Sequence, residues 1–170
     1  MKNMKLRLFV TMGAPGSGKS YFAERYCKEF GFACLRSDEI RKIIFPKPTY
    51  TQEEQDRLFA TIDFMAGKLL ASGISVVYDA NFSSRAFRAK RAMLAKKYGA
   101  RFCILWTKAP LELSIKRTKS RSFHPIDEET VRSVAREIEL PKNEQVIELD
   151  GTKPYRFQKL SVMKWAKKAK

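Results

Sequence analysis

The sequence predicts an α/β fold in which a parallel sheet lies between two layers of helices, a three-layer sandwich. Short apolar runs typical of buried strands alternate along the chain with longer segments of helical periodicity. Strands in this order are joined by right-handed helical crossovers. No repeat, low-complexity segment or Gly/Ser-rich linker interrupts the alternation, so we expect residues 1–170 to form a single domain.

The expected strands are short and end close to polar residues. They cover residues 6–12, 32–36, 74–78, 102–106 and 146–149. Helices are expected at 19–30, 38–45, 51–72, 84–98 and 127–140, a helix followed by a basic loop at 111–121, and a basic segment at 155–170. Thr51 and Glu54 have the spacing of a capping box for the third helix, whose apolar face is predicted to carry Leu58, Ile62, Met65 and Leu69. In such sheets ligands bind at the carboxyl ends of the strands.

Composition excludes several classes of protein. Hydrophobic residues make up 44% of the chain and charged residues 31%, without a long uncharged apolar run, so no membrane partner is expected. No signal-peptide pattern opens the chain, so we expect a cytoplasmic protein. The three cysteines are odd in number and form no close pair, which indicates neither a disulfide framework nor a zinc site. Nothing in the pattern indicates an oligomeric state.

The chain is strongly basic. Its 34 Lys and Arg residues exceed its 18 Asp and Glu residues, for a formal net charge of +16. Such an excess attracts polyanions, because each phosphate that a protein neutralises releases a bound counterion. A solubility trait is the alternative, but a role in binding anionic ligands is favoured.

A glycine-rich loop follows the first expected strand and precedes the first expected helix. It matches the P-loop pattern G-x-x-x-x-G-K-[ST] in full, with Gly13, Ala14, Pro15, Gly16, Ser17, Gly18, Lys19 and Ser20. Glycine lets successive backbone N–H groups point at one centre, and the following helix adds its positive dipole end. Lys19 is expected at the β- and γ-phosphates of a nucleotide, and the Ser20 hydroxyl on Mg²⁺. The motif predicts the P-loop NTPase version of the sandwich.

Candidates for an acceptor site follow the second strand. Asp38 is placed to face a bound γ-phosphate and to accept the proton of an attacking hydroxyl, as a kinase requires. Arg41, one helical turn later, is placed to hold an anionic group of the acceptor. The alternative is that Ser37 or Asp38 only caps a helix.

Two further polar groups follow the third and fourth strands. Asp79 occupies the position of a Walker B carboxylate or of a simple turn residue, and Asn81 and Arg85 follow it. Arg117 and Arg121 lie four residues apart in a basic run, where an arginine can stabilise the transferring phosphoryl group. A solvated basic face is the alternative for that run.

These motifs together resemble the P-loop kinases of the 5'-hydroxyl polynucleotide kinase type. The resemblance rests on the loop at 13–20, on Arg36, Asp38 and Arg41 as R-x-D-x-x-R, and on Asp79-Ala80-Asn81. Lys116-Arg117 with Arg121 is similar to the K-R-x-x-x-R lid of that family. The chain departs from it at Glu39, at Ala80 and in a shorter loop before Pro125. Gluconate kinases, chloramphenicol phosphotransferases and zeta toxins share much of this pattern.

The resemblance implies a role for each matching position. Asp38 is implied as the general base, Arg41 as the ligand of the phosphate next to the acceptor hydroxyl, and Arg121 as the lid arginine on the donor phosphates. Asp79 is implied on the acceptor or metal side of the site. A helical lid over the site, Mg²⁺ as cofactor and ATP as donor are implied as well.

Three functions compete. The first is an ATP-dependent kinase for the 5'-hydroxyl of a polynucleotide or a nucleoside 3'-phosphate, with nucleic-acid ends as partners. The second is a small-molecule kinase with a sugar acid, antibiotic or nucleotide sugar as acceptor. The third is a regulatory ATPase without kinase activity. Asp38, Arg41 and Arg121 together favour a kinase, and the basic excess favours the first function over the second.

Overall fold

The sheet of this protein has five parallel strands. The computed structural model describes residues 5–120 and 126–168. The strands are β1 (Arg7–Met12), β2 (Ala33–Arg36), β3 (Val76–Asp79), β4 (Arg101–Lys108) and β5 (Val146–Asp150), in the spatial order β2-β3-β1-β4-β5. All four neighbouring pairs are parallel. The predicted α/β fold with a parallel sheet is confirmed.

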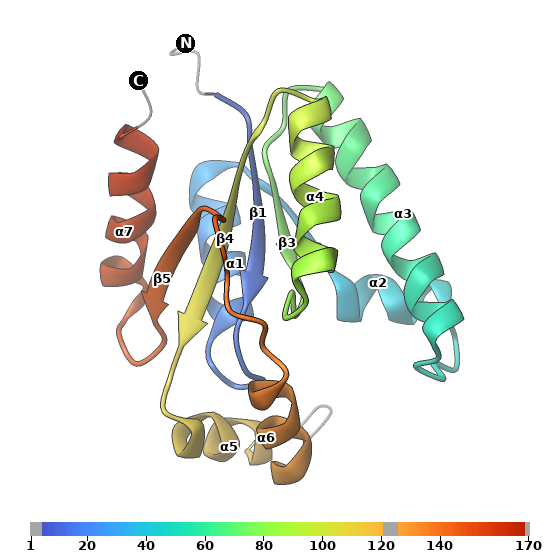
Figure 1. Cartoon of the computed structure of the whole chain (residues 1–170), viewed down its shortest axis with the longest axis vertical. Helices are drawn as coiled ribbons and strands as arrows, with labels where there is room; N and C mark the ends of the chain where they lie inside the picture. The colour runs from blue at the N-terminus through green and yellow to red at the C-terminus, as the bar shows by residue number, and fades with distance from the viewer. Residues whose placement is uncertain (1–4, 121–125, 169–170) are drawn as a thin grey trace.

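Helices cover both faces of the sheet. They are α1 (Lys19–Phe30), α2 (Ser37–Ile44), α3 (Gln52–Ala71), α4 (Arg85–Lys97), α5 (Leu111–Lys119), α6 (Glu128–Arg136) and α7 (Tyr155–Lys167). Helices α3 and α4 lie on one face, and α1 and α7 lie on the other (Figure 1). Helices α5 and α6 lie beyond the carboxyl ends of the strands, where the lid was expected (Figure 1).

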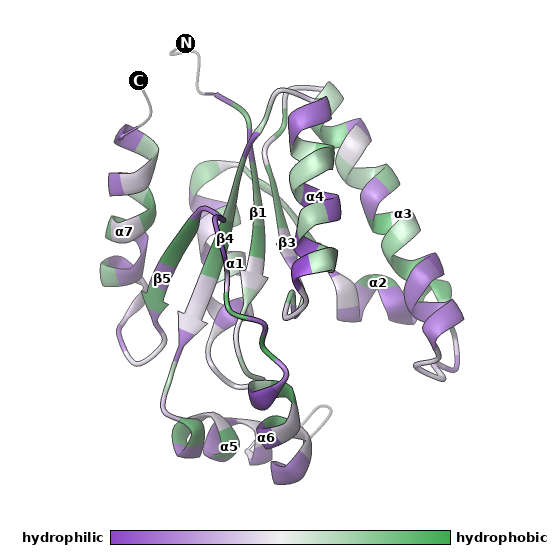
Figure 2. Cartoon of the chain, viewed as in Figure 1, coloured by the Kyte–Doolittle hydropathy of each residue, from purple (hydrophilic) through white to green (hydrophobic). Residues whose placement is uncertain are grey.

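The sheet separates two hydrophobic cores. Successive residues of a strand point to opposite faces, so Leu8 and Val10 of β1 join the core under α3 and α4, while Phe9 joins the core under α1 and α7. The side chains of Leu8, Phe9 and Val10 are all fully buried. In Figure 2 the strands are mainly green, and the covering helices alternate between green and purple, as expected for helices with one buried side.

Of the two hydrogen bonds of the capping box predicted at the start of α3, one is present. The Thr51 hydroxyl accepts a hydrogen bond from the backbone N–H of Glu54 at 3.3 Å. The Glu54 carboxylate does not return to Thr51; it accepts from the backbone N–H groups of Thr49 and Tyr50 instead. Of the predicted apolar face, Leu58 and Ile62 are fully buried, whereas Met65 is 37% exposed.

Several predicted boundaries move. Helix α6 ends at Arg136 and not at residue 140, and α5 ends at Lys119. The basic tail, for which no structure was predicted, forms α7, because Val162 is buried against the sheet. Within the described residues, no helix combines the length and the hydropathy that a membrane span requires.

Helix α4 carries a fully buried arginine. Arg88 makes two hydrogen bonds to the Glu144 carboxylate, both of 2.8 Å, and donates to the carbonyl oxygens of Phe82, Ser83 and Glu139. The side chain therefore joins the loop after β3 to the segment that returns from α6 to β5.

We expect Arg88→Met to lower the free energy of unfolding by about 3–5 kcal/mol, because it leaves buried carbonyls and Glu144 without their donor. Lys90→Met, at an exposed position of the same helix, is the matched control and should change it by less than about 0.5 kcal/mol. Chemical denaturation of the three proteins measures both values, and equal stability of the two variants would contradict this role of Arg88.

Candidate nucleotide and acceptor site

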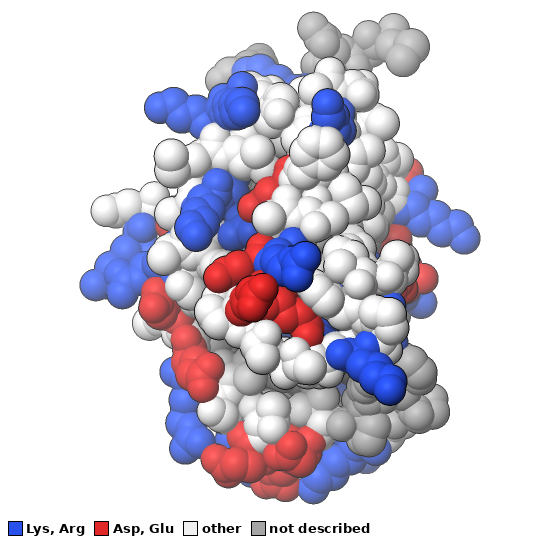
Figure 3. Space-filling model, turned by 90° about the vertical axis from the view of Figure 1, so that its right-hand side faces the viewer, with Lys and Arg blue, Asp and Glu red and all other residues white. Residues whose placement is uncertain are grey.

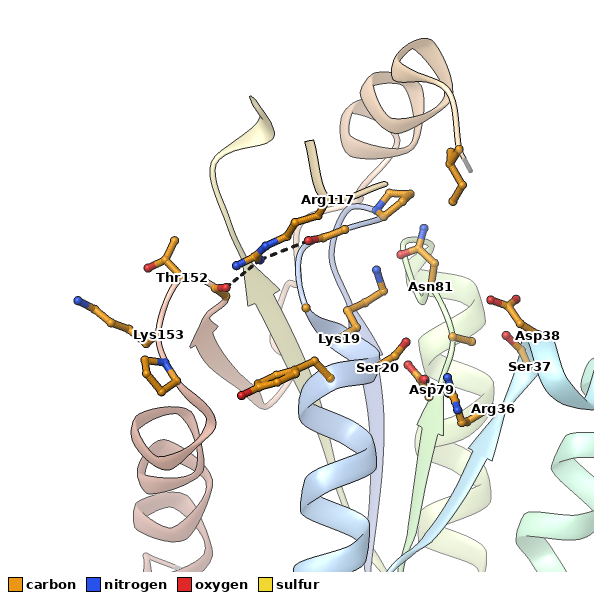
Figure 4. Close-up of a pocket in the computed structure, with 18 residues that line it drawn as sticks. Lys19, Ser20, Arg36, Ser37, Asp38, Asp79, Asn81, Arg117, Thr152 and Lys153 are labelled. Carbon is orange, nitrogen blue, oxygen red and sulfur yellow. Dashed lines mark hydrogen bonds and ion pairs between the residues drawn. The ribbon is translucent and has the colours of Figure 1, made fainter. Parts of the chain in front are cut away.

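One cavity of about 690 Å³ opens at the carboxyl ends of the strands. Its lining combines the glycine-rich loop, the ends of β2 and β3, α5 and the turn after β5 (Figure 4). Of the predicted residues it includes Pro15, Gly16, Gly18, Lys19, Ser20, Asp38, Asp79, Asn81 and Arg117. Segments far apart in the sequence thus meet at one site, as the parallel topology requires.

The glycine-rich loop is packed tightly against its neighbours. Gly13 and Gly16 have φ values of 142° and 82°, which side-chain-bearing residues rarely adopt. A Cβ atom at Gly13 would lie 2.3 Å from the carbonyl oxygen of Thr107, and one at Gly16 would lie 2.2 Å from that of Ser114. Both glycines are therefore required by conformation and by space.

Lys19 is folded back over this loop. Its ammonium group donates hydrogen bonds to the carbonyl oxygens of Gly13 at 2.7 Å and Ala14 at 2.9 Å. Because Lys19 opens α1, its charge and the positive end of the helix dipole act at the same place. This arrangement suits the binding of a phosphate chain.

The turn after β5 is a part of the site that the sequence analysis missed. A Cβ atom at Gly151 would lie 2.1 Å from the carbonyl oxygen of Ser17, so the turn touches the loop backbone. Arg117 bridges the two segments, donating to the carbonyl oxygens of Gly151 at 2.9 Å and Gly16 at 3.4 Å. Thr152, Lys153 and Pro154 complete this wall. A glycine directly after the last strand was the available signal.

Asp79 is a buried carboxylate at the floor of the cavity. It is 7% exposed. Burial raises its pKa above the usual value; the Ser20 hydroxyl and the charges of Lys19 and Arg36 oppose this effect, and Asp38 adds to it. Arg36 is its register partner on β2, with Nε 3.5 Å from Asp79 Oδ2. Arg36 also pairs with Glu39, so it connects a buried carboxylate to the surface of α2.

The oxygen atoms at this floor fit Mg²⁺. The Ser20 hydroxyl and the Asp79 carboxylate point toward one another below Lys19 (Figure 4). Mg²⁺ prefers hard oxygen ligands and is usually held by one or two protein oxygens together with substrate phosphates and water. Within the described residues no cluster of three or more His, Cys, Asp or Glu side chains forms a complete protein cage. Ser20 would therefore hold the ion together with the phosphates.

Asp38 lies across the cavity from the loop. It is in the first turn of α2, and Ser37, Ala80 and Asn81 also belong to the lining. Arg36 holds the N-cap position of α2, and no side chain caps the helix. The interpretation of Ser37 or Asp38 as a simple cap is therefore not supported.

Arg41 and Arg85 do not line the cavity. Arg41 is 6% exposed and pairs with the carboxylate of Glu54, while its second nitrogen donates to Gln55. Arg41 is therefore on the side of α2 that packs on α3, where Glu54 and Gln55 hold it. Arg85 pairs with Glu139 at 3.3 Å. Arg121 lies outside the described residues.

A family model described as an AAA domain matches residues 8–141. The chain belongs to this family. The match covers the loop, the strands β2, β3 and β4, and α5 with α6, whereas the cavity wall formed by Gly151, Thr152, Lys153 and Pro154 lies beyond it.

Relatives of this AAA-domain chain include proteins named as kinases. It is 30% identical over 136 residues to the L-seryl-tRNA(Sec) kinase of Mus musculus, which covers 80% of this chain and 34% of that protein. The chain thus spans about a third of the length of this curated relative. A solved sugar kinase from Janibacter sp. HTCC2649 has a TM-score of 0.73 and 21% identity, with 96% of each chain covered.

A second solved structure, the Pnkp1/Rnl/Hen1 RNA repair complex, has a TM-score of 0.70 and 22% identity. It matches 81% of this chain and 45% of that chain. At these identities both structures establish the fold alone.

The buried Asp79 makes stability depend on pH. Folding raises its pKa above the ordinary 3.8, so the folded protein keeps this proton to a higher pH than the unfolded chain does. Between the two pKa values unfolding releases a proton, and stability therefore falls as pH rises. Asp79→Asn does not titrate. We expect the free energy of unfolding of the native protein, relative to Asp79→Asn, to decrease across that window.

Denaturant titrations without nucleotide, at a series of pH values from below 3.8 upward, measure this difference. Asp56→Asn, at an exposed position of α3, is the control for removal of one carboxylate. A difference between the native protein and Asp79→Asn that stays constant with pH would contradict the raised pKa.

Proposed function

We propose that the protein is an ATP-dependent kinase that transfers the γ-phosphoryl group to a hydroxyl group, with residues 1–170 acting as one domain. The observation that carries the proposal is that Asp38 and the loop residues Lys19 and Ser20 line the same cavity from opposite sides (Figure 4). A nucleotide held by the loop places its terminal phosphate between them. A carboxylate in that position suits proton abstraction from an acceptor.

Each residue has a distinct task in this mechanism. The N–H groups of the loop and the ammonium group of Lys19 bind the β- and γ-phosphates, and Arg117 adds positive charge from α5. Asp38 accepts the proton of the acceptor hydroxyl. The hydroxyl oxygen bonds to the γ-phosphorus, and the bond between that phosphorus and the bridging oxygen breaks, so that this oxygen leaves with ADP. The Ser20 hydroxyl would hold Mg²⁺, which would supply neutralising positive charge at the phosphate oxygens. Arg121 remains the proposed lid arginine.

For the acceptor, we propose a hydroxyl carried by a nucleic acid, with the 5'-hydroxyl of a polynucleotide or a nucleoside 3'-phosphate first. The net charge of +16 supports an anionic partner. The name of the curated relative refers to a tRNA, and one structural match is to an RNA repair complex.

A small-molecule acceptor is the second candidate, because one observation favours it. Arg41, expected to bind the phosphate beside the acceptor hydroxyl, is occupied by Glu54 and Gln55. An acceptor without that phosphate, such as a sugar acid, antibiotic or nucleotide sugar, does not need this residue. The sugar kinase of the same fold is consistent with this alternative.

We expect Asp38→Asn to lower phosphoryl transfer by about a hundredfold or more and to leave ATP affinity nearly unchanged, because the amide keeps the shape but cannot take the proton. Lys19→Ala should weaken both, since its ammonium group serves the phosphates in the ground state and in the transition state. Asp56→Asn, far from the cavity lining, is the control. Calorimetric ATP titration and single-turnover transfer separate the two effects, and normal turnover by Asp38→Asn would overturn its role as base.

Transfer of labelled γ-phosphate to a panel of acceptors identifies the substrate class. The panel holds 5'-hydroxyl DNA and RNA, a nucleoside 3'-phosphate, its parent nucleoside, gluconate, and chloramphenicol as an antibiotic that carries hydroxyl groups. We expect the label to be transferred to the oligonucleotides and to the nucleoside 3'-phosphate. Labelling of gluconate or the antibiotic alone selects the second candidate, and ATP hydrolysis without any labelled acceptor supports the regulatory ATPase.

A further inference from the structure

Two arginines are direct neighbours at the amino ends of β1 and β4. The strand register pairs Arg7 with Arg101, so their side chains point to the same face of the sheet, the one covered by α1 and α7. The guanidinium carbon of Arg101 lies 3.7 Å from the centre of the Trp165 ring of α7. Phe9 packs on the same indole, with ring centres 5.6 Å apart. Like charges in directly opposite positions destabilise a sheet.

Neither arginine has a carboxylate partner among the described residues. The ion pairs of the described residues are all formed by arginines and lysines other than Arg7 and Arg101. The Nε atom of Arg7 is buried and, within the same residues, has no hydrogen-bond acceptor. Burial, and then the positive charge of Arg7, hold the pKa of Arg101 below its usual value. Buried donors of a charged group are rarely left without an acceptor.

The surroundings add donors and positive charge. The hydroxyl of Tyr26 on α1 accepts a hydrogen bond from the Arg7 side chain, and burial raises the pKa of Tyr26 to about 12, so the hydroxyl also keeps its own proton to donate. Lys164 and Lys167 belong to the last turn of α7, beside Trp165. Figure 3 shows the side of the molecule on which α3 and α4 lie, opposite to α7. At its upper end, where β1 and β4 begin, the charged groups in view are blue, so positive charge is in excess at this end on that side as well. Lower on that face the two colours are mixed.

We propose that Arg7 and Arg101 form a second anion-binding site, which takes a phosphate group, either free or in a phosphodiester backbone. One phosphate has enough oxygen atoms to accept from both guanidinium groups, and it removes the repulsion between them. Trp165 holds Arg101 in place from the other side of its guanidinium plane.

This site is distinct from the cavity. The cavity is at the carboxyl ends of the strands, and the arginine pair is at their amino ends (Figure 1). Strand β4 has eight residues, and at about 3.3 Å per residue its length separates the two places by roughly 23 Å. The phosphates of a nucleotide in the cavity therefore do not occupy the second site. The proposal goes beyond the kinase function and does not depend on the acceptor.

Inorganic phosphate at constant ionic strength is the first probe, with the shift in Tm as readout. The test is made in the Lys19→Ala chain, because the glycine-rich loop binds phosphate as well. We expect phosphate to raise the Tm of Lys19→Ala, and to raise it much less in Lys19→Ala/Arg101→Gln. Lys19→Ala/Lys96→Gln, which loses a charge at an exposed position of α4 on the opposite face, should keep the full shift.

A second readout does not depend on how Arg101→Gln changes stability. The chain has two tryptophans, so Trp106→Phe in the Lys19→Ala chain leaves Trp165 as the single indole. Phosphate should change its emission in a saturable way, and Arg101→Gln should abolish the change. Equal Tm shifts with and without Arg101, or emission that does not respond to phosphate, would overturn the proposal.

An oligonucleotide distinguishes the two sources of phosphate. A single strand that already carries a 5'-phosphate cannot serve as acceptor for the kinase. If the site takes a phosphodiester, Arg101→Gln should weaken binding and reduce the slope of log affinity against log salt by about 0.7, the contribution of one contact. Unchanged oligonucleotide binding together with a lost response to inorganic phosphate assigns the site to free phosphate.

Discussion

Direct contact between backbone segments is the constraint on which the nucleotide site depends. The glycine-rich loop touches β4 at Gly13, α5 at Gly16 and the turn after β5 at Gly151, and at each place a Cβ atom would lie within 2.3 Å of a carbonyl oxygen. Side chains cannot act as spacers here, so the loop takes its shape from the positions of three other segments. Donors that are fixed before a ligand arrives need no reorganisation when charge develops on it.

The sheet explains why these segments can meet. β1 is central, between β3 and β4, so the loop that leaves it has neighbours on both sides at the same edge. Arg117 ties α5 to this arrangement through the carbonyl oxygens of Gly16 and Gly151. The residue therefore has a structural task in addition to any contact with the donor.

Much of the fold and of the donor site could be predicted from the sequence, because local patterns determine both. The loop at 13–20 needs its residues at fixed spacing, and short apolar runs are sufficient to locate buried strands. Arg41 shows the limit of such reasoning. Its spacing from Asp38 is compatible with a shared site, but only the packing of α2 on α3 reveals that Glu54 binds it. The same limit applies to Gly151, whose importance comes from Ser17, distant in sequence.

The hydrogen bonds of Arg88 limit where the length of the chain can vary in proteins of this architecture. Arg88 holds the carbonyl oxygen of Glu139 and the carboxylate of Glu144, just after α6, whereas Arg117 holds the other end of the α5–α6 arm at the glycine-rich loop. The described parts of the arm are thus tied to the rest of the molecule at both of these places. Insertions between α5 and α6 leave both anchors in place, while a deletion between residues 139 and 144 separates Arg88 from its acceptors. Diversity in chain length is therefore expected to concentrate between α5 and α6 and to be rare between residues 139 and 144, where Arg88 finds its acceptors.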